Sequence, residues 1–195
     1  MRRPLIWISL AAVLIAAAAV VAVTSTDEGS GDPGAGNPGS ADVDFDRALA
    51  GAPPALARLY DRGDALIPGG ADELHAQLEA LRGHPAVVNV WASWCGPCRF
   101  EFPDLQRVAA RIGDEVAFIG VDSEDSDDAA RTFLDELPLP YPSVSDPDGE
   151  VFDELELRGL PGTAFYDADG ELRHVKQGPY TSAEDLTADV ERYAG

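Results

Sequence analysis

The chain has 195 residues, of which 45% are hydrophobic, enough to bury the core of one domain of ordinary size. This composition excludes wholesale disorder, collagen-like repeats and a small fold held together by disulfides. Fourteen basic residues face 35 acidic ones, a net charge of −21, so a nucleic-acid partner is excluded by electrostatic repulsion and a solvated acidic surface is the simplest interpretation.

The N-terminus carries a candidate membrane anchor. Arg2 and Arg3 precede an uncharged apolar run from Leu5 to Val23, which at 1.5 Å per residue nearly crosses a hydrocarbon core about 30 Å thick. The run is longer than the apolar part of a cleavable signal peptide and ends without a clean cleavage site. We therefore expect residues 1–26 to form an uncleaved single-pass anchor in the cell membrane, with the basic pair on the cytoplasmic side.

The remainder divides into a spacer and one domain. Residues 27–41 consist mainly of Gly, Ser, Pro, Asp and Asn, the composition of a flexible linker. Residues 42–195 form the domain, which the orientation of the anchor places outside the cytoplasm.

The first part of the domain is predicted to be helical. Apolar residues from Phe45 to Pro68, interrupted by Pro53 and Pro54, indicate two short helical pieces. After a break at two glycines, a third helix is predicted from the spacing of Leu74, Leu78 and Leu81.

Strands and helices then alternate. The β-branched and aromatic residues of Ala86–Ala92 predict a strand buried on both faces. The next elements are predicted as a helix over Cys98–Ile112, a strand over Val116–Val121, a helix over Ala130–Leu137, a strand over Tyr141–Val144 and a helix over Val151–Leu157.

A hairpin and a last helix complete the domain. Thr163–Tyr166 and Leu172–Val175 are predicted strands around a turn that contains Gly170, and Ser182 with Asp185 resembles a capping box. The order β-α-β-α-β-α-β-β-α predicts an α/β fold with a mixed central sheet and helices on both faces.

The only two cysteines are Cys95 and Cys98. A bond between them closes too small a loop to stabilise the fold much. Cys95 follows a buried strand and opens a helix, so its thiol faces unsatisfied N–H groups and the positive end of the helix dipole. Because a thiolate attacks disulfides, this predicts Cys95 as the nucleophile and Cys98 as the resolving thiol.

An acidic residue shares the helix face of the second cysteine. Cys98, Glu101, Leu105, Val108 and Ile112 recur at intervals of three and four residues. Because the apolar members must face the core, Glu101 is expected to point inward, where desolvation raises its pKa. It would then shuttle the proton of Cys98; the alternative is a glutamate at the edge of the apolar face with its carboxylate in solvent.

The sequence around the cysteines resembles a known active site. Trp94–Cys98, after a buried strand, resembles the active site of thioredoxins, and Ala92–Pro103 is more similar to the membrane-anchored TlpA/ResA branch of that family. The resemblance extends from about Phe45 to the C-terminus. It implies a thioredoxin fold and a redox-active pair with Gly96 and Pro97 between its cysteines.

The resemblance also implies further site residues. In the TlpA/ResA branch an acid lies three residues after the second cysteine, which is Glu101 here, whereas thioredoxins carry an aspartate at the position of Asn89. A cis peptide between Leu160 and Pro161 would face the cysteines, with Leu160 offering backbone hydrogen bonds to an extended substrate. Gly162 departs from the family, which has threonine or a larger residue there.

Metal binding is the weaker interpretation of the cysteine pair. A structural zinc site needs about four ligands, and the remaining candidates are His75, His84 and His174. The acidic segment Asp122–Asp128 lacks the glycine of an EF-hand loop, so a solvated loop is favoured over a calcium site. We therefore expect no metal and no cofactor beyond the redox-active disulfide.

Together these features predict a membrane-tethered, extracytoplasmic and monomeric thiol-disulfide oxidoreductase. The candidate catalytic residues are Cys95, Cys98 and Glu101, and the candidate substrate contacts are Trp94, Leu160 and Pro161. The resemblance implies reduction of protein disulfides, as in cytochrome c maturation, with electrons from a membrane protein. The residues leave open an oxidant that forms disulfides, a peroxidase, a redox-gated binding module and a metal-delivery protein.

Overall fold

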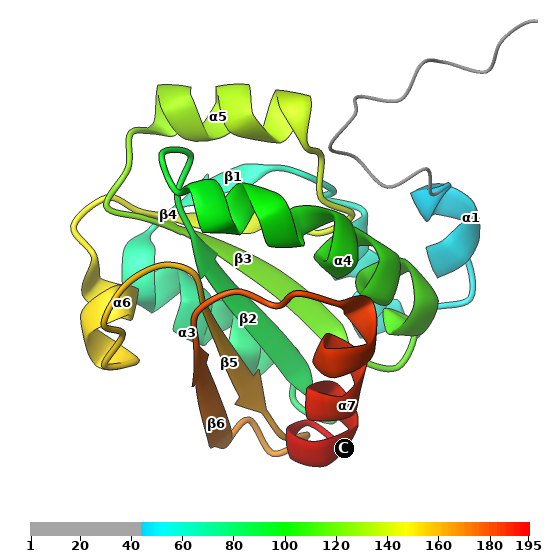
Figure 1. Cartoon of the computed structure of the whole chain (residues 1–195). Helices are drawn as coiled ribbons and strands as arrows, with labels where there is room; N and C mark the ends of the chain where they lie inside the picture. The colour runs from blue at the N-terminus through cyan, green and yellow to red at the C-terminus, as the bar shows by residue number, and fades with distance from the viewer. Residues whose placement is uncertain (1–43) are drawn as a thin grey trace, which may run out of the picture. The chain divides into compact units, whose positions relative to one another are not determined.

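The computed structural model describes residues 44–195, which form a six-stranded sheet with helices on both faces (Figure 1). The predicted anchor, residues 1–26, and the predicted linker, residues 27–41, lie outside the described residues. No helix within 44–195 combines the length and the apolar character that crossing a membrane requires.

The sheet is mixed, as predicted. Its strands are β1 (Leu66–Pro68), β2 (Ala86–Trp91), β3 (Ala117–Ser123), β4 (Ser143–Asp146), β5 (Gly162–Tyr166) and β6 (Leu172–Gln177), in the spatial order β1-β4-β3-β2-β5-β6. The first four strands are parallel, and the hairpin of β5 and β6 adds antiparallel pairing next to β2. Strands β2 and β3 are buried along their whole length, because helices cover both faces of the sheet at its centre.

Helices cover the two faces unequally. They are α1 (Phe45–Leu49), α2 (Pro54–Tyr60), α3 (Gly70–Ala80), α4 (Gly96–Ile112), α5 (Asp127–Glu136), α6 (Glu150–Glu154) and α7 (Ala183–Tyr193). Helices α4, α5 and α7 lie on one face of the sheet and α3 and α6 on the other (Figure 1). The Ser182 hydroxyl accepts a 3.1 Å hydrogen bond from the Asp185 backbone at the start of α7, which confirms the predicted cap.

The N-terminal part of the domain differs from the prediction. Residues Leu66–Pro68, expected to end a helical piece, form the edge strand β1, in which Leu66 pairs with Ser143 of β4. Pairing with β4 provides backbone partners that a helix interrupted by Pro68 and the following glycines cannot supply. Gly69 and Gly70 both have positive φ, 136° and 55°, yet α3 starts at Gly70 rather than after it.

An aromatic cluster joins the sheet to the helices above it. The rings of Trp91 (β2), Phe102 (α4) and Phe133 (α5) lie with centroids 4.9–5.4 Å apart, and all three are buried. The Trp91 indole N–H also donates to the Ser143 hydroxyl of β4 at 3.2 Å. This bond crosses Gly120 of β3, where a Cβ would lie 2.9 Å from the indole nitrogen and overlap the hydroxyl. Only glycine leaves room for the hydrogen bond.

We expect Gly120→Ala to lower the free energy of unfolding by about 1–3 kcal/mol, because the added methyl separates a buried donor from its acceptor. Urea denaturation of the full-length chain measures the change. Gly51→Ala is the matched control, since nothing lies within 4 Å of a Cβ there. Equal stabilities for the two variants would contradict this account of Gly120.

Candidate active site

The sulfur of Cys95 occupies the cap of helix α4. The helix begins at Gly96, earlier than the predicted start at Cys98, and the Cys98 backbone N–H donates to Cys95 Sγ at 3.1 Å. A side-chain oxygen usually accepts this bond at a helix start. After reduction of the pair, the free N–H groups and the helix dipole stabilise a thiolate at this position.

The two cysteines form a disulfide and differ in access. Their Cα atoms are 5.3 Å apart. Cys98 is fully buried, whereas Cys95 keeps 4% of its surface exposed. A partner sulfur can therefore reach Cys95 before Cys98, which favours Cys95 as the attacking residue.

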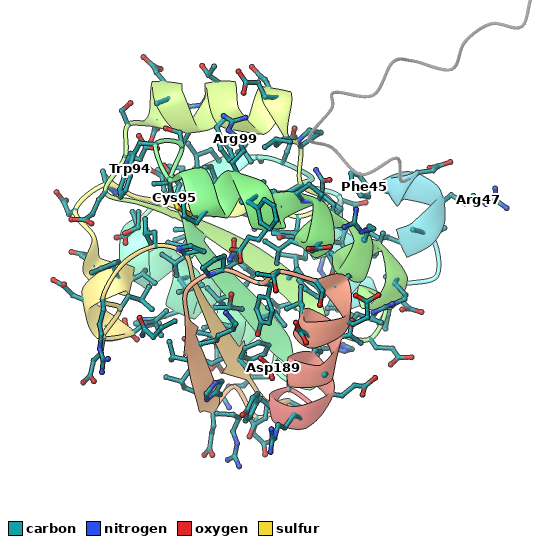
Figure 2. All side chains as sticks on the ribbon, in the orientation of Figure 1. Phe45, Arg47, Trp94, Cys95, Arg99 and Asp189 are labelled. Atoms are coloured by element: carbon teal, nitrogen blue, oxygen red, sulfur yellow. A yellow bond between two sulfur atoms is a disulfide. The ribbon has the colours of Figure 1, made fainter. Side chains whose placement is uncertain are left out.

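The segment before Cys95 is held by the loop after β3. The Ser93 backbone N–H donates to Asp125 Oδ2 at 2.6 Å, and the Trp94 indole N–H donates to the Glu124 carbonyl at 3.2 Å. Trp94 is 61% exposed and stands with Cys95 at the N-terminal end of α4 (Figure 2). No sequence pattern indicates this role of Asp125, because only the fold brings the two loops together.

Glu101 points into the protein, as the helix spacing predicts. Its side chain is fully buried, and its carboxylate accepts two hydrogen bonds of 2.8 Å, from Asn89 Nδ2 to Oε1 and from the Tyr180 backbone N–H to Oε2. Burial raises the pKa of Glu101 to about 7, although both hydrogen bonds and the charge of Lys176 act in the opposite direction. A carboxyl group with this pKa exchanges a proton readily near neutral pH.

The structure gives Asn89 a defined contact. Asn89 lies on β2 beneath α4 and donates to Glu101, and its Nδ2 also lies 3.5 Å from Thr163 Oγ1. An aspartate at this position would put a second carboxylate against Glu101, and two buried like charges repel each other. An amide at residue 89 is therefore compatible with an acid at residue 101.

The predicted cis peptide between Leu160 and Pro161 lies at the same end of the sheet as the cysteines. The Leu160–Pro161 peptide bond is cis, as the resemblance predicts. Gly162 pairs with Val90 in antiparallel register, so Pro161 lies beside the end of β2 that leads into the cysteine motif. At Gly162 a Cβ would lie 2.8 Å from Leu157 Cδ1, so the side chain of Leu157 fills the space that a larger residue would need.

The acidic segment Asp122–Asp128 is only partly a solvated loop, which corrects the prediction for its first residue. Asp122 belongs to β3 and is 1% exposed, and no donor reaches its carboxyl oxygens. Burial, followed by the charge of Asp125, raises the pKa of Asp122 to about 8. Asp127 and Asp128 lie in the first turn of α5, where the helix dipole favours acidic side chains.

The described residues offer no obvious metal site. Within 44–195, no group of three or more His, Cys, Asp or Glu side chains is arranged to hold a metal ion. His75 instead pairs with Glu154 at 2.9 Å, and His174 stacks on Tyr193 with ring centroids 4.1 Å apart.

The chain matches a known protein family and is similar to several named proteins. The sequence model described as the AhpC/TSA family matches residues 68–175, more than half of the chain and including both cysteines. The chain belongs to the AhpC/TSA family.

This AhpC/TSA-family chain is 40% identical over 110 residues to the thiol:disulfide interchange protein DsbE of Pseudomonas aeruginosa, covering 55% of this chain and 59% of that protein. It is 31% identical over 132 residues to the thiol-disulfide oxidoreductase ResA of Oceanobacillus iheyensis, covering 64% and 69% respectively. The match thus spans less than two thirds of the DsbE relative.

Solved structures of similar proteins confirm the thioredoxin fold. MTB dsbF, in mixed oxidised and reduced forms, matches with a TM-score of 0.53 and 34% identity, covering 58% of this chain and 84% of that one. A DsbF homologue from Corynebacterium diphtheriae matches with a TM-score of 0.50 and 26% identity, covering 59% and 75%. The mixed sheet of this AhpC/TSA-family chain therefore has the predicted architecture.

Asp122 should make stability fall as pH rises. Its folded pKa of about 8 lies above the ordinary value of 3.8, so the native state keeps a proton that the unfolded chain loses over this pH range. The free energy of unfolding of the wild type should therefore fall between pH 5.5 and pH 8.5. In Asp122→Asn, which has no carboxyl group at this position, we expect this fall to be smaller by about 1–3 kcal/mol. Urea denaturation at both pH values measures it.

Asp128→Asn is the control for this comparison, because the Asp128 side chain is fully exposed. It should follow the wild-type pH dependence. If Asp122→Asn follows the wild type as well, the buried carboxyl group does not hold its proton as described.

Proposed function

We propose that this chain is a thiol-disulfide oxidoreductase that exchanges electrons between its cysteine pair and disulfides of other proteins. The position of Cys95 carries the proposal: its sulfur caps α4 and accepts the Cys98 N–H, while Cys98 is buried behind it. The printed names of the relatives, thiol:disulfide interchange protein and thiol-disulfide oxidoreductase, support it.

The reaction proceeds in two thiolate attacks. The Cys95 thiolate of the reduced pair attacks one sulfur of the partner disulfide, forms a mixed disulfide and releases the first partner thiolate, which takes a proton from solvent. Cys98 then gives its proton to Glu101 and attacks Cys95 Sγ, which releases the second partner thiolate. The proton on Glu101 passes to that leaving thiolate, directly or through solvent. The partner gains two electrons, and Cys95 and Cys98 end as the disulfide.

The rim of the site supplies the substrate contacts. Trp94 is mostly exposed and offers an aromatic surface beside Cys95. Leu160 is half-buried and would pair its backbone with an extended segment of the partner. Pro161, next to the end of β2, would lie against the same segment. The chemistry needs no further cofactor, since the two cysteines carry both electrons.

In the cell we propose a reductive role outside the cytoplasm, for example in cytochrome c maturation. This role rests on the resemblance to the TlpA/ResA branch and on the apolar run from Leu5 to Val23, which would tether the domain to the cell membrane. A membrane protein would supply electrons to restore the dithiol, because the extracytoplasmic space keeps thiols oxidised.

Single substitutions in the cysteine pair test the order of attack. We expect Cys98→Ser to accumulate mixed disulfides with a disulfide-bonded substrate such as scrambled ribonuclease, because no resolving thiol remains. Cys95→Ser should abolish turnover. Non-reducing gels and intact mass spectrometry of the full-length chain detect the adducts, with the double serine variant as the blank. Wild-type turnover by Cys95→Ser would refute the mechanism.

The reduction potential tests the direction. Equilibration of the full-length chain in dithiothreitol and glutathione buffers, followed by thiol trapping, gives its value. We expect a potential near that of thioredoxin, about −270 mV, or lower, because such a dithiol gives up electrons readily. A potential near about −120 mV would identify an oxidant that installs disulfides, and the reductive role would have to be abandoned.

A further inference from the structure

Lys176 is the only lysine in the chain, and its ammonium group is used inside the protein. Nζ donates to the carbonyl oxygens of Gly178 at 2.7 Å and Pro179 at 2.9 Å. It also lies 4.3 Å from the centre of the Tyr180 ring, a distance at which a cation is attracted by the aromatic face. A half-buried lysine thus binds three consecutive residues of the loop between β6 and α7.

That loop contacts two candidate site residues. The Gly178 N–H donates to the carbonyl oxygen of Pro161 at 2.9 Å, and the Tyr180 N–H donates to Glu101 Oε2 at 2.8 Å. The far side of the loop is fixed by α7, because the Tyr180 hydroxyl donates to Asp189 Oδ2 at 2.7 Å. The chain bends sharply at Gly178, whose φ is 81°.

Sheet register places Lys176 on the correct face for these contacts. Asn89 of β2 pairs with Thr163 of β5, and Thr163 pairs with Lys176 of β6. Residues paired directly across neighbouring strands share a face, so the three side chains form a row beneath α4. Asn89 donates to one oxygen of Glu101, and the loop held by Lys176 donates to the other.

We propose that Lys176 is a positioning residue of the redox site. It fixes the Gly178–Tyr180 turn so that one backbone N–H binds Glu101 and another binds Pro161, and it places a positive charge near the Glu101 carboxylate. The effect of Lys176 on disulfide exchange rests on the proposed function, in which Glu101 accepts the proton of Cys98; its effect on the position and the charge state of Glu101 does not.

The charges around Glu101 explain why a cation matters there. Asp104, from α4 itself, opposes ionisation of Glu101, and Lys176, from β6, favours it. The other titratable groups facing this carboxylate are the phenols of Tyr141 and Tyr180, and Asn89 from β2 is neutral. Without Lys176, burial and Asp104 would act on Glu101 with less opposition, and the Tyr180 N–H would lose its support.

The decisive measurement is the titration of Glu101 in the oxidised full-length chain, in which the disulfide prevents the cysteines from titrating. Glutamate labelled with ¹³C at the side-chain carboxyl reports the titration by NMR, and Glu101→Gln identifies the signal by its loss. We expect Lys176→Met to move the Glu101 midpoint upward by roughly one pH unit or more and to speed hydrogen exchange of the Tyr180 amide. Lys176→Arg keeps the charge and should restore most of both properties.

Arg173→Met is the matched control. Arg173 lies on the same strand but at the irregularity in the β5–β6 pairing, and its guanidinium approaches Asp167 and Glu171 at 3.8–3.9 Å. Its removal changes the net charge by the same amount. If Lys176→Met leaves the Glu101 midpoint and the Tyr180 amide unchanged, or changes them no more than Arg173→Met does, the proposal is wrong.

Turnover measurements separate this inference from the proposed function. If the proposal is right, Lys176→Met exchanges disulfides several-fold more slowly than the wild type near pH 7. Its rate returns toward the wild-type rate at higher pH, where Glu101 ionises again. If Glu101→Gln exchanges disulfides like the wild type while Lys176→Met still moves the Glu101 titration, the proton-transfer role fails and the positioning role of Lys176 stands.

Discussion

The burial of one carboxyl group organises this molecule. Glu101 is placed under α4 with no exposed surface, where an ionised carboxylate without partners would cost several kcal/mol. Its two oxygens accept bonds from Asn89 on β2 and from Tyr180 in the loop before α7. Three segments far apart in the sequence therefore have to meet within hydrogen-bonding distance of one side chain. The same arrangement leaves the carboxyl group poised between its two protonation states.

The elements that hold Glu101 also position the redox pair. The first N–H groups of helix α4 face Cys95, and Cys98 is buried in the first turn of the same helix. Glu101 follows one turn later. Because β5 runs antiparallel to β2, Pro161, the residue before β5, lies next to the end of β2 that leads into α4. The loop after β6 then reaches both Pro161 and Glu101. The parallel and antiparallel halves of the sheet thus meet at the site.

The acidic composition has two different structural meanings. Within residues 44–195, most acidic residues lie where solvent or a helix N-terminus accommodates them, as Asp127 and Asp128 do at the start of α5. Asp122 is buried within β3, and Asp125 fixes the Ser93 backbone just before the cysteine motif. Charge counted along the chain cannot separate these cases, because the difference lies in burial and in hydrogen-bond partners.

Local patterns were sufficient for the elements whose causes are local. The period of the apolar residues predicted α4 with Glu101 on its buried face, and the turn around Gly170 predicted the β5–β6 hairpin. Leu66–Pro68 was misassigned because three residues carry no periodicity, and this edge strand exists only through its pairing with β4. The cis bond before Pro161 was implied by family resemblance alone.

The sequence by itself determined the type of chemistry, since two cysteines at a helix start and an acid one turn later are set by spacing along one element. The tertiary structure decided how that acid is held. Lys176, Tyr180 and Asp125 act on the site through hydrogen bonds between residues 32 to 79 positions apart or through a turn that such bonds fix. No local pattern encodes these contacts, because their geometry depends on strand register and on the packing of α4 and α7 over the sheet.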